Sequence, residues 1–325
     1  MTKRRAVLGA IAAVPFVAAG PPARAQFNRS LRLIVPFAPG GTSDILARLM
    51  APKLTEALGQ NVVVENKPGA NGNIGADFVA KAQPDGHTLL LTDVGSLATA
   101  PALFSKLSFD VNKDLAPVTM VLFAPYIMAV HPSVPAATVP ELVAYAKANP
   151  DKLNVAHSGV GAANHLTAIV FAKHFGITWS YVPYRGGAAA IRAVAQNECQ
   201  VLLNGATATQ PFVVQGQMKG LAVSGAPRLA ALPDTPSFGE MGLPKTLVDS
   251  GTWQGIVTTG GTPAGTVAAL SDAIRRVLAQ PDIAAKVTEL GGVNRAEGPE
   301  PFAAWMKDAI ASWGQVVRAE GITLD

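Results

Sequence analysis

Residues 31–44 read LRLIVPFAPGGTSD, and this stretch decides the fold class. The apolar run from Leu31 to Phe37 is typical of a buried β-strand, and the Pro and Gly residues that follow it indicate a tight turn. From Asp44 to Leu58 the apolar side chains recur near helical spacing, and Gly59 is a typical helix terminator. A strand, a turn and a crossover helix form the repeating unit of parallel α/β folds, so the sequence predicts an α/β protein.

The same alternation continues on both sides of a long apolar segment at 118–130. The first series has further strands at 62–65 and 88–92, and the second has strands at 153–156, 179–182 and 201–204 with helices between them. The last third has one apolar strand after Trp253 and helical patterns at 266–278, 282–290 and 301–319. These three helices have no sheet of their own, so we expect them to pack on the first series. The chain would then cross twice between two lobes.

The N-terminus has the features of a secretory signal peptide. Lys3, Arg4 and Arg5 precede an apolar run from Ala6 to Ala19, and Ala23-Arg24-Ala25 offers a small-residue cleavage site. The apolar run is shorter than the roughly 20 residues that a membrane span needs. The sequence therefore predicts a periplasmic protein with residues 1–25 removed and no membrane insertion after cleavage, exported by either the general secretory or the twin-arginine route.

Charge argues against a nucleic-acid partner. Four of the 26 Lys and Arg residues lie in the expected leader, which has no acidic residue, so the remaining chain has as many basic as acidic side chains, 22 of each. Sequence-independent binding to nucleic acid or to an anionic membrane needs a strong basic field, which this balance removes. The single cysteine, Cys199, is expected to be a small buried side chain, and stability must come from the core.

Motifs for catalysis and for cofactors are missing. The chain has no GxSxG elbow, no HExxH, no phosphate-binding GxxxxGK[ST] loop and no His or Cys pair at metal-ligand spacing. His157 and Ser158 are neighbours in sequence, which does not establish the facing geometry that a nucleophile and its base require. We therefore expect no catalytic residue, no metal and no cofactor.

Three Gly-rich polar loops each follow an apolar strand and open a helix, at Ala38–Asp44, Ser158–His165 and Tyr184–Ala188. Glycine lets backbone N–H groups approach a ligand, and a helix N-terminus favours an anion. Such glycines can also serve only the tight turn. Three loops at equivalent strand ends favour a shared cleft that captures a carboxylate, since ligands of open α/β sheets bind beyond the carboxyl ends of the strands.

At these loops the sequence resembles the tripartite tricarboxylate transporter receptor family, the Bug-type periplasmic binding proteins. The matching motifs are ordered over nearly the whole chain: Val35-Pro36-Phe37-Ala38-Pro39-Gly40-Gly41 with Asp44, Glu65-Asn66-Lys67-Pro68-Gly69-Ala70 with Gly72 and Gly75, Pro84-Asp85-Gly86-His87-Thr88-Leu89, Gly159-Val160-Gly161 before His165-Leu166, Val182-Pro183-Tyr184-Arg185-Gly186-Gly187, and Arg228 with Leu232-Pro233-Asp234-Thr235-Pro236 before Glu240-Met241-Gly242.

The resemblance implies a type II-like periplasmic binding protein with two lobes, each a mixed sheet flanked by helices, joined by two crossing strands. The expected lobes are residues 26–127 with 252–325, and residues 128–251. The candidate ligand-binding residues on the first lobe are Phe37, Ala38, Gly40, Gly41, Ser43, Asp44 and Ser96. Those on the second lobe are Ser158, Gly161, Ala162, Ala163, Asn164, His165, Tyr184, Arg185, Gly186, Gly187, Ala188 and Asn204.

Some of these positions have alternative roles or depart from the family pattern. Asp44 can instead cap a helix, and Arg185 can be a solvated surface charge. Ala162 stands where many relatives have Ser or Thr, so fewer polar groups line the pocket. Asn204 stands where Asp is common, and if it faces the cleft the site lacks an anion for an ammonium group, which favours a carboxylate without an amine over an amino acid.

The resemblance predicts a receptor that delivers a small carboxylate to a tripartite membrane permease. The alternatives are a sensor that signals to a partner protein and a secreted hydrolase.

Overall fold

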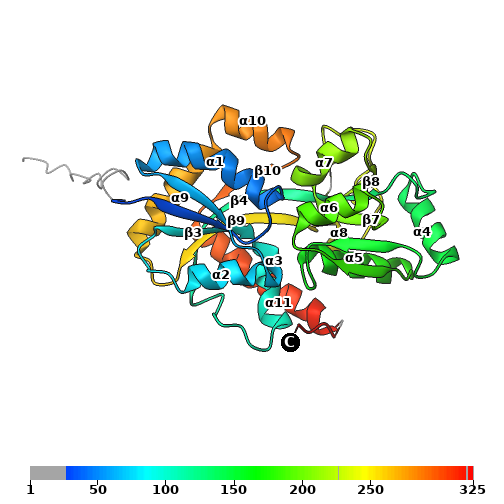
Figure 1. The fold of residues 1–325 in the computed structure, drawn as a ribbon, viewed down its shortest axis with the longest axis horizontal. Coiled ribbons are helices and arrows are strands. Elements are labelled where there is room, and N and C mark those ends of the chain that lie inside the picture. The colour runs from blue at the N-terminus through cyan, green and yellow to red at the C-terminus, as the bar shows by residue number, and fades with distance from the viewer. Residues whose placement is uncertain (1–26, 226, 320, 325) are drawn as a thin grey trace, which may run out of the picture.

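The structure, a computed structural model, describes residues 27–225, 227–319 and 321–324. It has an α/β architecture in which two groups of helices surround the two halves of one mixed sheet (Figure 1). The signal peptide expected at residues 1–25 lies outside the described residues. Within the part of the chain that is described, no helix is long and apolar enough to cross a membrane.

The first lobe begins with three parallel strands, since β1 pairs with both β2 and β3. Its elements are β1 (Leu31–Val35), α1 (Thr42–Leu58), β2 (Val62–Asn66), the 3₁₀ turn η2 (Ala70–Gly72), α2 (Asn73–Ala80), β3 (Thr88–Asp93) and α3 (Val94–Leu103).

The second lobe repeats this arrangement with β5 parallel to both β6 and β7. Its elements are α4 (Val139–Ala148), β5 (Asn154–His157), α5 (Ala163–Phe175), β6 (Ser180–Pro183), α6 (Gly187–Ala195), β7 (Val201–Gly205), α7 (Ala206–Val214), β8 (Lys219–Val223) and α8 (Lys245–Val248).

The last third returns to the first lobe, as the sequence predicts. Its elements are β9 (Gly251–Thr259), α9 (Ala264–Leu278), α10 (Pro281–Glu289), β10 (Val293–Glu297) and α11 (Pro299–Ala319). Helix α9 packs on α1, and α11 packs on α3. The side chains of α9 and α10 therefore complete the same apolar core as those of β1 and α1.

One long strand, β4 (Leu115–Val130), belongs to both halves of the sheet. Residues 115–125 of β4 pair with β9, and residues 126–130 pair with β7 and β8. The resulting strand order is β2-β1-β3-β9-β4-β7-β5-β6, with β8 and β10 also paired to β4. The lobe boundaries expected at residues 127 and 252 fall within these two strands and remain a prediction.

Strand β1 is buried on both faces because helices cover both sides of the sheet. Leu33 and Val35 point into the core shared with α1 and α9, whereas Ile34 points into the core shared with α2 and α11. A strand buried in this way has apolar residues on both faces, which is why residues 31–37 are apolar except for Arg32, a half-buried side chain that pairs with Glu65.

The amphipathic pattern did not predict helix α3. Eight of its ten residues are buried, among them Gly95 and Ser96, so no polar face marks it in the sequence. Pro101 also lies inside this helix. Cys199 is buried and unpaired, as expected.

The first lobe is tightly packed around Gly255 in β9, so a substitution there tests this packing. A Cβ atom at this position would lie 2.6 Å from Cζ of Phe302 and 2.8 Å from Cγ1 of Val94. We expect Gly255→Ala to lower the free energy of unfolding by about 1–3 kcal/mol, measured by urea unfolding. The control is Gly265→Ala in α9, where a Cβ meets no described atom within 4 Å and alanine favours the helix. Equal destabilisation by both variants would contradict this interpretation.

Candidate functional site

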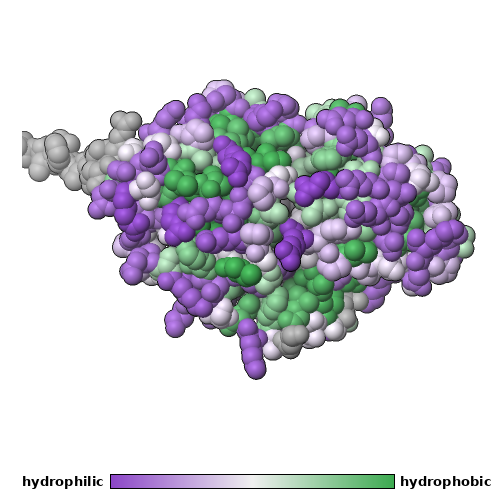
Figure 2. Space-filling view, viewed as in Figure 1, coloured by the Kyte–Doolittle hydropathy of each residue, from purple (hydrophilic) through white to green (hydrophobic). Residues whose placement is uncertain are grey.

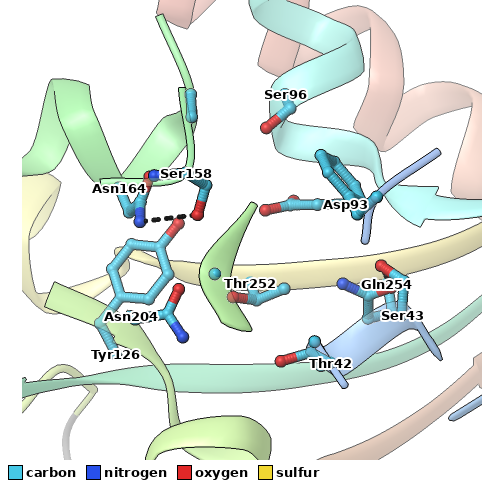
Figure 3. Close-up of a pocket in the computed structure, with 14 residues that line it drawn as sticks. Thr42, Ser43, Asp93, Ser96, Tyr126, Ser158, Asn164, Asn204, Thr252 and Gln254 are labelled. Atoms are coloured by element: carbon cyan, nitrogen blue, oxygen red, sulfur yellow. Dashed lines mark hydrogen bonds between the residues drawn. The ribbon is translucent and has the colours of Figure 1, made fainter. Parts of the chain in front are cut away.

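A cavity lies between the lobes, beyond the carboxyl ends of strands β1, β3, β5 and β7 (Figure 3). Side chains from both lobes and from the connecting strands β4 and β9 surround it. The described lining residues are Phe37, Gly41, Thr42, Ser43, Asp93, Ser96, Tyr126, Ser158, Ala162, Asn164, Gly187, Asn204, Thr252 and Gln254.

Three helices begin at this cavity without a side-chain cap among the described residues. They are α1 after Gly41, α5 after Ala162 and α6 after Gly186. The first turn of a helix leaves backbone N–H groups without helical partners and carries a partial positive charge. No Lys or Arg belongs to the described lining, so these helix ends supply its positive potential. The arrangement suits an anion that accepts hydrogen bonds from backbone amides.

Asp93 carries the only charged side chain in the described lining. Burial raises its pKa to about 7, although backbone N–H groups of Gly95, Trp253 and Ser96 favour the ionised form. The carboxylate caps α3 by accepting the Gly95 N–H at 3.0 Å. The N-terminus of α3 therefore already has an anion of its own, unlike those of α5 and α6. The first turn of α1 contains Asp44, whose carboxylate pairs with Arg48.

The connecting strands contribute polar groups that lack partners. The Ser43 hydroxyl donates to Oε1 of Gln254 at 2.8 Å, but Nε2 of Gln254 has no hydrogen-bond partner among the described residues. The Tyr126 hydroxyl is also buried without a partner in that part of the chain. Each of these two residues is 1% exposed. Buried polar atoms are nearly always paired, so these two are suited to a ligand or to ordered water.

In the second lobe, amide side chains hold the lining in place. Nδ2 of Asn164 donates to Oγ of Ser158 at 3.1 Å and to the Leu203 carbonyl at 3.2 Å. Nδ2 of Asn204 donates to Oγ1 of Thr209 at 3.1 Å. These bonds join the loop before α5 to the end of β7 and fix this wall of the cavity.

Two stacked histidines support the loop before α5 from behind. The rings of His157 and His165 have centroids 4.2 Å apart. Burial lowers the pKa of His157 to about 4 and that of His165 to about 3, so both are neutral at pH 7. Neutral His165 accepts the Gly161 N–H on Nδ1 at 3.1 Å, which orients the loop backbone.

The two lobes are in contact around the cavity. The Thr99 hydroxyl on α3 shares its one proton between the Ser96 carbonyl of its own helix, at 2.8 Å, and the Gly161 carbonyl of the second lobe, at 3.1 Å. A Cβ atom at Gly40 would lie 3.8 Å from that of Ala188. These contacts bring the first and second lobes together beside the cavity.

The structure brings nine of the sequence-predicted site residues to the cavity. They are Phe37, Gly41, Ser43, Ser96, Ser158, Ala162, Asn164, Gly187 and Asn204. The other candidates lie in the same loops but outside the described lining: Ala38, Gly40, Asp44, Gly161, Ala163, His165, Tyr184, Arg185, Gly186 and Ala188. Their contacts with a ligand stay a prediction.

Asp44 stabilises the first loop from within the helix. It is the third residue of α1, whose N-cap is Gly41, so it is not itself the N-cap. Its carboxylate accepts the Gly40 N–H at 3.0 Å and pairs with Arg48 at 3.0 Å. Desolvation raises the pKa of Asp44, but bonds from Arg48, Gly40 and Asn66 outweigh it, and the pKa falls below its usual value.

In the third loop, Arg185 is exposed and the Tyr184 hydroxyl contacts Sγ of Cys199 at 3.4 Å. The pKa of Tyr184 lies above its usual value, mainly because of burial. The Tyr184 hydroxyl thus has a contact within the protein, and Arg185 is a surface charge.

Sequence reasoning missed five lining residues: Thr42, Asp93, Tyr126, Thr252 and Gln254. Thr42 lies inside a loop that was already recognised. Asp93 had a usable signal, because an acidic residue between an apolar strand and Gly95-Ser96 is a typical helix cap. Tyr126, Thr252 and Gln254 lie within strands, where no local pattern distinguishes them from other residues of a sheet.

Comparison with known proteins identifies the family. The model of the tripartite tricarboxylate transporter family receptor matches residues 46–322. The chain belongs to this receptor family. The Bug-type resemblance in the sequence is thereby confirmed.

Solved structures of related proteins share the architecture. The periplasmic binding protein BugD is 32% identical, with a TM-score of 0.86 over 91% of this chain and 99% of its own. A protein from R. palustris, solved with adipate, is 30% identical with a TM-score of 0.85, over 91% of this chain and 99% of its own. MatC from Rhodopseudomonas palustris, with bound malate, is 31% identical with a TM-score of 0.83, over 89% and 99%. The two-lobed fold of periplasmic binding proteins is thus shown for this chain.

The raised pKa of Asp93 predicts a pH-dependent effect on stability. Between the ordinary carboxyl pKa of 3.8 and about 7 the folded protein holds a proton that the unfolded chain releases, so this group's contribution falls as pH rises through that window. We therefore compare the free energy of unfolding of Asp93→Asn minus that of wild type at two pH values. We expect this difference to be higher at pH 8 than at pH 5 by on the order of 1–3 kcal/mol.

The measurement is urea unfolding of the ligand-free protein at both pH values. The lowered pKa values of His157 and His165 make the free energy of unfolding rise with pH below 6.5, opposite to the effect of Asp93. This contribution is the same in variant and wild type, so it cancels when the two proteins are compared at each pH. The same difference between variant and wild type at both pH values would contradict the pKa of Asp93.

Proposed function

We propose that this chain is a periplasmic receptor that binds a small organic carboxylate between its lobes and delivers it to a tripartite membrane permease. The observation that carries the proposal is the set of helix N-termini of α1, α5 and α6, which lack side-chain caps among the described residues and meet at one cavity. A carboxylate can accept hydrogen bonds from several backbone N–H groups at once, and the helix ends favour its charge.

The related proteins support this choice of ligand class. MatC holds malate, and the R. palustris relative was solved with adipate. Both ligands are small organic acids, and both proteins share at least 30% of their residues with this chain over most of its length. Delivery to a permease follows the description of the family, whereas a sensor would use the same cavity and pass its closed form to a signalling protein.

The geometry favours binding over hydrolysis. Nδ1 of His157 lies 2.8 Å from the Gly159 carbonyl, and Oγ of Ser158 accepts the Asn164 amide. His157 is therefore oriented by backbone rather than toward the neighbouring hydroxyl. A hydrolase would need a base within hydrogen-bond reach of its nucleophile.

The first test is a thermal-shift screen of the protein from Gln26 onward against mono-, di- and tricarboxylates, aromatic acids and amino acids. The protein is first unfolded and refolded to remove carried ligand. A ligand that binds only the folded state raises the melting temperature. At a ligand concentration of 100 Kd it adds about 2.7 kcal/mol to the free energy of unfolding. A selective rise with one acid class is expected. A flat response of folded protein to every carboxylate would rule the receptor out.

A substitution at the α6 N-terminus tests where the carboxylate binds. A Cβ atom at Gly187 would lie 2.7 Å from Oδ1 of Asn204, so Gly187→Ala displaces that amide and places a methyl group beside the helix end. We expect the Kd for the acid found in the screen to rise about tenfold or more, a loss of roughly 1.4 kcal/mol. The control is Gly298→Ala, where a Cβ meets no described atom within 4 Å. An unchanged Kd in calorimetry of Gly187→Ala would remove α6 from the site.

The contact between Thr99 and Gly161 predicts that the lobes open and close around the ligand. Each lobe supplies only part of the lining, so the ligand stabilises the closed form. We expect X-ray scattering to show a smaller radius of gyration with ligand than without. Thr99→Val removes the hydroxyl that bridges the lobes and should weaken ligand binding by about 0.5–1.5 kcal/mol. If the radius of gyration is the same with and without ligand, and the ligand binds rapidly, the binding site is already formed in the ligand-free protein.

A further inference from the structure

We propose that Asp93, Tyr126 and Gln254 form a subsite that takes a hydroxyl group of the ligand and rejects a second carboxylate. The inference rests on the proposed function and narrows it, because it names the group that the bound acid presents away from its carboxylate. The preferred ligand is then a hydroxy-monocarboxylate. Figure 3 shows the three side chains around the same space, with the carboxyl group of Asp93 and the hydroxyl of Tyr126 directed into it.

The first step is the distribution of charge around the cavity. The second lobe presents the N-termini of α5 and α6, which attract an anion. The first lobe presents the N-terminus of α1 and, beside it, Asp93, the only charged group of the described lining. Above pH 7 this carboxyl is mostly ionised, because burial raises its pKa only to about 7. A dianionic ligand held by α5 and α6 would bring its second carboxylate toward Asp93, and like charges repel strongly where water is largely excluded.

The second step is the position of Gln254. Asp93 on β3 and Gln254 on β9 are directly paired across the antiparallel ladder, so their side chains stand on the same face of the sheet. Oε1 of Gln254 is occupied by the Ser43 hydroxyl, which leaves Nε2 as a buried donor with no partner among the described residues. The subsite thus places an acceptor, Asp93, beside a free donor.

The third step is the Tyr126 hydroxyl on β4. It is buried and makes no hydrogen bond of good geometry with the described residues. Desolvation and the nearby charge of Asp93 outweigh the neighbouring Thr252 side chain, which lowers the pKa, and hold the pKa of Tyr126 well above the ordinary value. Tyr126 therefore keeps its proton and can donate or accept one hydrogen bond.

A hydroxyl group satisfies all three side chains at once. It donates to Asp93, and its two lone pairs accept from Nε2 of Gln254 and from Tyr126. An ammonium group would satisfy Asp93 but would leave Nε2 of Gln254 facing another donor. A methyl group would leave Nε2 of Gln254 and the Tyr126 hydroxyl unpaired and would donate nothing to Asp93, which disfavours binding.

The test uses matched straight-chain acids of three to six carbons that differ only at the far end. Each length is examined with a methyl, hydroxyl, ammonium or carboxylate terminus, as in butyrate, 4-hydroxybutyrate, 4-aminobutyrate and succinate. Calorimetry is done at pH 8.5, where Asp93 is ionised. At the length that binds best, we expect the hydroxyl compound to bind about tenfold or more tightly than the other three. A dicarboxylate or amino acid of equal or higher affinity would overturn the subsite.

Asp93→Asn keeps the size of the side chain and an acceptor for the α3 cap, but it removes the charge. We expect the preference for the hydroxyl compound over the dicarboxylate to fall by about tenfold or more. The matched control is Asp110→Asn, because Asp110 also caps backbone N–H groups, of Asn112 and Lys113, but is exposed and outside the described lining. An unchanged preference in folded Asp93→Asn would contradict the proposal.

Gln254→Met provides an independent variant in case Asp93→Asn does not fold. It removes the free donor at similar volume, and we expect it to abolish the advantage of the hydroxyl compound over the methyl compound. Failure of this subsite is distinct from failure of the receptor function. If a dicarboxylate binds best, the receptor stands and the subsite is wrong. If folded protein binds no carboxylate in the wider screen, both are wrong.

Discussion

The antiparallel pairing of β4 with β9 is the constraint on which the rest of the structure depends. Residues 115–125 of β4 pair with β9 in the first lobe, and the same strand continues into the second lobe beside β7. Because β4 is one continuous strand near the middle of the sheet, it joins the two lobes side by side while their loops face each other. This pairing also brings Thr252 and Gln254 of β9 and Tyr126 of β4 to the cavity that the loops enclose.

The electrostatics of the cavity follow from backbone geometry more than from charged side chains. The ends of α1, α5 and α6 supply positive potential without a Lys or Arg in the described lining, so an anion can be held without a fixed ion pair. Neutral His157 and His165 support this wall without adding charge. Asp93 introduces the opposite sign at the other wall, and this asymmetry can distinguish the two ends of a ligand.

The sequence predicted the elements with clear local signals. The apolar run at 31–37, the loop at 38–44 and the helix that ends near Gly59 correspond to β1 and α1, and the three terminal helices pack on the first lobe as expected. Helix α3 escaped prediction because burial on nearly all sides removes its polar face. Asp44 was assigned to the helix start but acts from the third helical position, a distinction that depends on where the backbone turns.

By itself, the sequence determined the α/β class, the family and the Gly-rich loops that contribute Gly41, Ala162 and Gly187 to the cavity, because strand patterns and turn chemistry are local properties of the chain. Only the tertiary structure decided which polar side chains share the site. Asp93 and Gln254 are 161 positions apart and meet through strand register, while Tyr126 joins them from a third strand. Register and burial depend on how distant segments pack. They raise the pKa of Asp93, and they leave Nε2 of Gln254 and the Tyr126 hydroxyl without a hydrogen bond to the described residues.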